Sequence, residues 1–131
     1  MTAKNLFRTL LPVALILFLT AAGTPDKRTS AAIEKVMKRM SKPSKEIKKL
    51  AKAKQFTSAS FSKNIILLAK ENKKMLRIKH PEEDFNNLSK ELDKEFTKLT
   101  AILKNKKFSD IKKGWENVQS LCYECHDTYK D

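Results

Sequence analysis

Two cysteines and a histidine stand close together near the end of this chain of 131 residues. Cys122 and Cys125 are its two cysteines, and His126 follows directly. On a helix these positions are i, i+3 and i+4, so all three side chains project from one face. Two thiols and an imidazole on one face can attach a cofactor covalently, coordinate a metal ion or carry out dithiol exchange.

The pattern Cys-x-x-Cys-His is the sequence motif for attachment of a c-type haem. In that chemistry two thiols add across the haem vinyl groups, and the adjacent imidazole then meets the iron from one side. The spacing matters because three atoms must reach one macrocycle at once. The motif therefore predicts one covalently bound haem c and its iron.

The other chemistries need surroundings that the sequence does not offer. A thioredoxin-like dithiol opens a helix after a strand, whereas Cys122 and Cys125 stand near the end of the last expected helix. A zinc site would need His80 as its fourth ligand, and the positions of Cys125, His126 and His80 do not match finger spacing. A purely structural role, with two packed thiols beside a surface histidine, would not explain why His126 directly follows Cys125 in a chain whose first residues resemble an export leader.

The first 23 residues have the pattern of a secretory leader. A basic start with Lys4 and Arg8 precedes an apolar run from Leu10 to Leu19 and small residues at 21–23. The run falls well short of the roughly 20 residues that span a bilayer, so a cleaved signal peptide over 1–23 is favoured over a retained anchor. We expect a periplasmic or otherwise exported domain over 24–131 with no stable membrane span.

The chain is strongly basic. Its formal net charge is +13, and loss of Lys4 and Arg8 with the leader leaves +11. A basic excess fits an acidic protein partner or an anionic membrane surface, and export makes nucleic acid the poorest candidate partner. Because the lysines are spread along the whole chain, their simplest role is to solvate helix faces.

Helices must position the motif, because the chain has only two glycines and is rich in Lys, Leu, Glu and Ala. A first helix is expected after a cap at Thr29 or Ser30, with a kink or break at 41–44, where Pro43 removes a hydrogen bond. Its apolar face holds Ile33, Val36, Met37 and Met40, and it resumes at Ile47, Leu50 and Ala51.

Two further helices follow from the apolar spacing. One is expected from about Ser58 to Arg77, with a face of Phe61, Ile65, Leu68 and Leu76 widened by Ile66 and Leu67. The stretch IKHPEED then predicts a new start, because proline suits the first helical position and acidic residues suit the first turn. The next face consists of Phe85, Leu88, Leu92, Phe96, Leu99, Ile102 and Leu103.

The last helix carries the motif. Ser109 can cap it, and Gly114 weakens it only modestly. Its apolar face consists of Ile111, Trp115, Val118, Leu121, Cys122 and Cys125. Four amphipathic helices with short connections predict an all-α, antiparallel up-down-up-down four-helix bundle, in which the motif faces the core of the last helix.

The C-terminal stretch SLCYECHDTYK resembles the haem helix of class II cytochromes c, the cytochrome c′ family. Beyond the motif, the match includes Asp127, Tyr129 and Lys130. The resemblance implies an exported four-helix bundle with Cys-x-x-Cys-His in its fourth helix. It also implies that Cys122 and Cys125 form the thioether bonds and that His126 is the proximal iron ligand.

Function depends on what faces the iron opposite His126. A methionine thioether would give a low-spin electron carrier, whereas an apolar residue would leave an open site for nitric oxide or carbon monoxide. In an up-down-up-down bundle Met37 lies near the level of His126, and the resemblance also implies a distal residue in the first helix. Met37 is the expected distal ligand and Met40 the alternative, while simple core packing stays open for Met37.

Met75 and His80 fall at the same end of the bundle. Met75 ends an apolar face, and His80 before Pro81 has the setting of an exposed loop histidine, so neither is preferred as a ligand.

The expected function is single-electron transfer between redox protein partners, acidic ones among them. The alternative is binding or sequestration of a small gas at a five-coordinate iron. The sequence offers no paired carboxylates, general acid or phosphate-binding glycine loop, so we expect no enzymatic activity and assign no catalytic residue. The resemblance adds homodimerisation through the first two helices, which many family members show.

Overall fold

The computed structural model describes residues 26–129. They form four helices, α2 (Lys27–Lys52), α3 (Ala59–Leu76), α4 (Glu83–Leu103) and α5 (Phe108–Tyr129). No strand occurs in this range, so the predicted all-α four-helix bundle is confirmed. The expected leader, its cleavage site and Lys130 lie outside the described residues.

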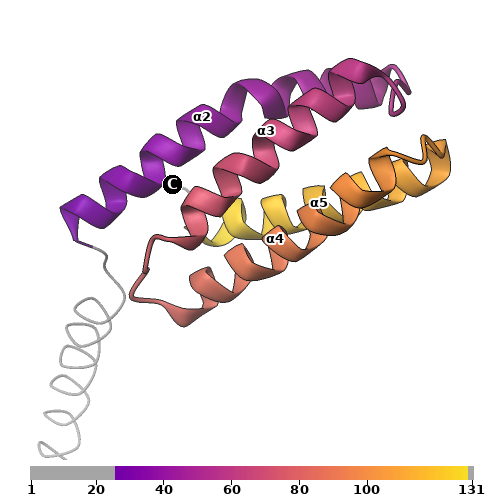
Figure 1. Cartoon of the computed structure of the whole chain (residues 1–131). Helices are drawn as coiled ribbons and strands as arrows, with labels where there is room; N and C mark the ends of the chain where they lie inside the picture. The colour runs from indigo at the N-terminus through magenta and orange to yellow at the C-terminus, as the bar shows by residue number, and fades with distance from the viewer. Residues whose placement is uncertain (1–25, 130–131) are drawn as a thin grey trace, which may run out of the picture.

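The four helices are arranged as two antiparallel hairpins, α2 with α3 and α4 with α5 (Figure 1). The backbones pack closely within each hairpin and between α3 and α4. The start of α2, the connection from α3 to α4 and the end of α5 lie at the same end (Figure 1), as the up-down-up-down order requires. Across the described range α2 and α5 are not packed together in this way, and this boundary is called the seam below.

The first described helix begins earlier than the sequence predicted. Asp26 caps α2 by accepting a hydrogen bond from the Thr29 backbone N–H at 2.7 Å. An N-cap side chain must stand ahead of the amides that it satisfies, so Thr29 donates to the cap and neither Thr29 nor Ser30 is the cap. The hydrogen bonds from Thr29 favour the carboxylate and lower the pKa of Asp26.

Of the kink or break predicted at 41–44, the break does not occur, because α2 continues through Pro43 to Lys52. An interior proline costs about 3 kcal/mol through a lost hydrogen bond and a steric clash. Pro43 and Ile47 are both buried, so their packing against the rest of the bundle offsets that cost.

The second described helix, α3, begins where the sequence placed it. Ser58 caps α3 by accepting from the Phe61 N–H at 3.1 Å. The predicted widening of its face is wrong, because Ile66 and Leu67 are 56% and 41% exposed. The buried stripe advances in alternating steps of four and three residues, and it consists of Phe61, Ile65, Leu68, Asn72 and Met75.

The starts of the last two helices differ slightly from the prediction. The cap position of α4 is Glu82, directly after Pro81. Helix α5 begins at Phe108, and the Lys107 carbonyl accepts from the Ile111 N–H at 3.0 Å. Ser109 therefore lies inside the first turn and is not the cap.

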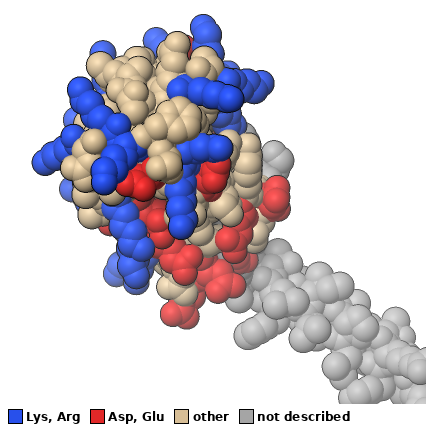
Figure 2. Space-filling model, turned by 90° about the vertical axis from the view of Figure 1, so that its right-hand side faces the viewer, with Lys and Arg blue, Asp and Glu red and all other residues tan. Residues whose placement is uncertain are grey.

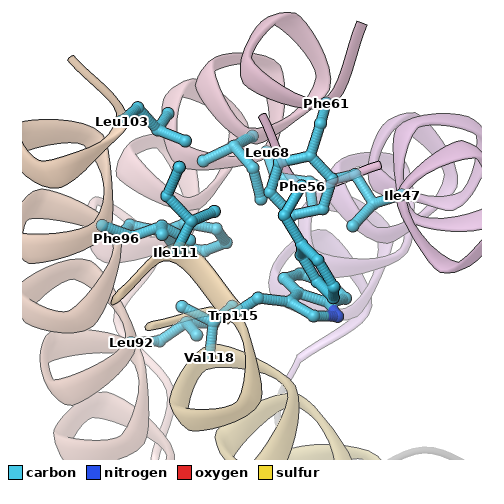
Figure 3. Close-up of a cluster of buried hydrophobic side chains, with 12 residues drawn as sticks. Ile47, Phe56, Phe61, Leu68, Leu92, Phe96, Leu103, Ile111, Trp115 and Val118 are labelled. Atoms are coloured by element: carbon cyan, nitrogen blue, oxygen red, sulfur yellow. The ribbon is translucent and has the colours of Figure 1, made fainter. Parts of the chain in front are cut away.

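The larger core cluster, drawn in Figure 3, includes Phe56 between α2 and α3, and Leu103 and Ile111 beside the connection between α4 and α5, so it lies toward the end where each hairpin turns. Its aromatic members meet edge to face, with ring centroids 5.3 Å apart for Phe56 and Phe61 and 6.2 Å apart for Phe61 and Trp115. A smaller cluster of Val36, Met75 and Phe85 stands toward the other end, with Met37, Met40 and Cys125 packed against it. The motif thus lies at the more lightly filled end.

Gly114 allows α4 and α5 to approach closely. A Cβ at this position would lie 2.9 Å from Cδ1 of Leu99 and 3.2 Å from Cδ1 of Ile102. Leu99 is fully buried, so it has little room to move aside. The glycine therefore sets the spacing of the hairpin that carries the motif.

Replacing this glycine by a branched residue should destabilise the fold. We expect Gly114→Val to lower the free energy of unfolding by about 1–3 kcal/mol, because overpacking exceeds the gain in helix propensity. Urea unfolding followed by circular dichroism measures the change. Asn117→Val, at an exposed position of the same helix, is the control and should stay within about 0.5 kcal/mol of the parent. Equal stability of the parent and Gly114→Val would contradict the packing role.

Candidate functional site

The three motif residues share one side of α5 and line a single cavity. Cys122 and Cys125 are half-buried, and His126 is exposed. The predicted helical spacing therefore brings the two thiols and the imidazole together on one surface, as expected for positions i, i+3 and i+4.

The cavity has a volume of about 260 Å³ and is bounded by all four helices. Its inner wall comes largely from α3, α4 and the buried side of α5. This wall includes Leu68, Asn72, Met75, Phe85, Leu88, Ser89, Leu92 and Trp115. The lining is mainly apolar, which suits a large hydrophobic group.

The exposed residues that line the cavity all come from α2 and α5. They are Ser41, Lys45, Lys48, Tyr123 and His126, and they are called the rim below. The cavity therefore opens along the seam. The side of α2 that faces it changes along the helix from Met37 and Met40 to serines and lysines.

These residues fit a covalently held haem. Its macrocycle is apolar, which matches the apolar inner wall, and its carboxylate-bearing edge is polar, which suits the open side of the cavity at the seam. Cys122 and Cys125 present two thiols to the cavity, and His126 presents an imidazole from the next position. The seam between α2 and α5 provides the space that a flat group needs between two helices.

The environment of the thiols argues against dithiol catalysis. Burial, assisted by the neighbouring Cys125, raises the pKa of the Cys122 thiol to about 11, although Lys48 acts in the opposite direction. Burial and the charge of Glu124 also raise the pKa of Cys125. A thioredoxin-like cysteine is activated by a lowered pKa, so these thiols have the opposite setting.

A protein-only metal centre is not assembled in the part of the chain that the structure describes. No three side chains of His, Cys, Asp or Glu come close enough there to hold an ion. His80, which the zinc alternative required, is absent from the lining of the cavity.

The three candidate methionines all reach the cavity. Met37 and Met40 are half-buried on α2, and Met75 is buried on α3. Met37 also packs against the apolar cluster of Val36, Met75 and Phe85. Met37 and Met40 therefore both remain candidate ligands by position. Met75 also lines the cavity, although the sequence analysis did not prefer it.

His80 is not the exposed loop histidine that the sequence suggested. It is half-buried and stacks on Phe85 with ring centroids 4.6 Å apart. Its Nδ1 accepts from the Glu82 N–H at 3.0 Å, and its backbone exchanges hydrogen bonds with the Asn86 side chain. The residue closes the connection between α3 and α4.

Sequence reasoning missed the polar members of the site. Asn72 is 1% exposed and donates to the Ser89 carbonyl at 3.3 Å, joining α3 to α4 beside the cavity. Lys48 places its Nζ 5.6 Å from the centre of the Tyr123 ring, across the seam. Helical spacing from the methionine stripe of α2 was the available signal for the lysines of the rim.

Comparison with known proteins gives one family. The family described as Cytochrome C' matches residues 77–130, a range that includes α4, α5 and the motif. No curated protein and no solved structure matches the chain. In the described residues, no helix is both long and apolar enough to cross a membrane.

The raised thiol pKa can be tested on the haem-free chain. In Cys125→Ser, alkylation of Cys122 by iodoacetamide at pH 8 should be at least about tenfold slower in the folded state than in urea, because burial, the largest cause of the raised pKa, remains after Cys125 is removed. The folded-state rate should still rise with pH above 9.0, the ordinary pKa of the thiol, because burial keeps the pKa of Cys122 raised. Circular dichroism must first show a folded helical chain. Equal rates with and without urea would contradict a buried thiol.

Proposed function

We propose that this chain, which its family match and four-helix fold assign to the cytochrome c′ family, carries single electrons as an exported monohaem c-type cytochrome. The family suggests a monohaem c-type cytochrome with covalently bound haem c. Electron transfer, export and the roles of individual residues are the further content of the proposal.

The observation that carries the proposal is the position of the motif on α5. Cys122, Cys125 and His126 line one cavity bounded by four helices, and that cavity opens at the seam. Two half-buried thiols that line this cavity are well placed to add to the vinyl groups of a macrocycle inside it. Haem iron, when bound, supplies a one-electron couple whose potential depends on its axial ligands and surroundings.

The residues of the chain divide the remaining work. Cys122 and Cys125 would hold the group to α5, and the imidazole of His126 would bind its iron. Met37 on α2 would offer its thioether as a second iron ligand, with Met40 as the alternative. The buried side chains of α3 and α4 exclude water from the inner wall, which leaves the rim as the route for electrons.

Gas binding is the second candidate. The observation that favours it is the packing of Met37 against Val36, Met75 and Phe85, which gives this side chain a sufficient role as core filler. If packing is its whole role, the iron keeps an open position for a small gas.

Removing both thiols should abolish covalent attachment. We expect Cys122→Ala combined with Cys125→Ala to lose all haem that survives a denaturing gel, because thioethers are the bonds that resist denaturation. Haem staining of the gel beside an immunoblot for the chain is the measurement. Ser120→Ala on the same helix is the control and should keep its haem. A haem band that persists in the double variant would defeat the proposal.

The distal residue can be identified with carbon monoxide. We expect the reduced parent protein to show sharp absorption bands that do not respond to the gas, because Met37 closes the sixth position. Met37→Ala should open that position, so its spectrum should become high-spin and shift on adding carbon monoxide. Met40→Ala is the matched control and should behave as the parent does.

The other outcomes are equally informative. A response to carbon monoxide in the parent would replace electron transfer by gas binding. A response in Met40→Ala but not in Met37→Ala would move the distal role to Met40.

A further inference from the structure

We propose that the rim and the neighbouring lysines of α2 form the docking surface for an acidic redox protein, which exchanges electrons with the site through the seam. The inference rests on the proposed function. It names the surface and the charge of the partner, which neither the family match nor the motif specifies.

The first support is the distribution of charge among the helices. Helix α2 carries ten basic residues and two acidic ones, whereas α4 and α5 each carry more acidic than basic residues. The basic residues of α2 are Lys27, Arg28, Lys35, Lys38, Arg39, Lys42, Lys45, Lys48, Lys49 and Lys52. In the end view of Figure 2, lysines and arginines gather over the upper part and acidic side chains over the lower part. The lysines are thus not spread evenly in space, although they are spread along the sequence.

The second support is that these charges are not neutralised inside the described molecule. The single ion pair formed on α2 within the described range joins Lys38 to Glu34 at 3.3 Å. Lys45, Lys48 and Lys49 are exposed and take part in no ion pair there. Their field is therefore available to a partner, as electrostatic steering requires.

The third support is where the charges lie relative to the site. Lys45 and Lys48 line the cavity itself, and the Nζ of Lys48 lies over the exposed ring of Tyr123. An acidic surface placed on these two lysines would cover the opening of the seam. That position brings the redox centre of the partner toward the cavity, beside the helix that carries the motif.

The surface fits a protein better than a lipid bilayer. Peripheral membrane helices combine lysines with large apolar side chains that enter the acyl region. The exposed large apolar residues of the described chain are Ile66 and Leu67 on α3, and Phe108 and Tyr123 on α5. None of them is on α2, and Tyr123 alone belongs to the rim. The α2 surface thus offers charge and hydrogen bonding without an apolar anchor.

The electron step needs no bond making. A strongly acidic flavodoxin in its hydroquinone form is a suitable probe. Its anionic flavin gives up one electron and becomes the neutral semiquinone, while the ferric iron becomes ferrous and no proton moves. Stopped-flow absorbance follows both changes in the haem-loaded protein.

The test compares two pairs of charge reversals. Lys45→Glu with Lys48→Glu reverses the rim, and Lys94→Glu with Lys113→Glu makes the same charge change at exposed positions of α4 and α5 outside the cavity lining. At low salt we expect the rim variant to react with flavodoxin at least about tenfold more slowly than the parent. We expect the control pair to lose less than about threefold, and high salt to bring all three rates together.

Two further readouts distinguish a failure of the proposed function from a failure of the docking surface. Haem content is first set equal from the absorbance, and each flavodoxin rate is divided by the rate with the neutral reductant duroquinol, which removes any effect of the charge reversals on the haem itself. Absence of a haem spectrum in the parent would defeat the proposed function itself. A haem-loaded parent whose flavodoxin rate is insensitive to salt, or equal losses in the two variants, would overturn the docking surface alone. Rim-dependent binding to phosphatidylglycerol vesicles without any effect on flavodoxin would overturn it in favour of a membrane.

Discussion

The structure depends on one face of α5, which both packs into the core and carries the motif at the cavity. Ile111, Trp115 and Val118 are buried on this face, and the same face continues into Cys122, Cys125 and His126 at the cavity. A helix returns to the same side every three or four residues, so core packing and cofactor attachment follow one periodicity. The first half of α5 fixes the helix in the bundle, and the second half then has a defined position opposite α2. Gly114 supports this division by holding α5 close to α4.

The sequence predicted those parts of the fold that follow from apolar spacing. Helices α4 and α5 and the position of the motif agree with the prediction because their apolar faces repeat every three or four residues, from Phe85 to Leu103 and from Ile111 to Cys125. The break at Pro43 was wrong because the local cost of a proline is smaller than the packing that α2 gains as one helix. The widened face of α3 was wrong because an unbroken apolar run does not show which of its members face outward. Those members turned out to be Ile66 and Leu67.

The candidate site was predictable in its chemistry but less so in its surroundings. The spacing of Cys122, Cys125 and His126 placed them on one surface, and the antiparallel order brought Met37 to the cavity. The rim was not predicted: helical spacing from Met37 and Met40 places Lys45 and Lys48 on the same side of α2, but spacing alone does not show that a cavity lies beside them. The structure separates the two cases through contacts across the seam, such as that of Lys48 with Tyr123. Asn72 was missed because a polar residue inside an apolar stripe is visible only once burial is known.

The seam also bears on how much noncovalent affinity the cavity can have for a cofactor. Because α2 and α5 are not closely packed against each other, a group between them makes fewer contacts than it would between two tightly packed helices. Covalent attachment removes that demand, since a tethered group experiences an effective concentration in the millimolar range for short flexible tethers. In the haem-bearing protein proposed above, even weak noncovalent contacts would keep the group in place. The side chains of the cavity that face α5 then do not have to hold the group in place. They can instead determine how the group reacts.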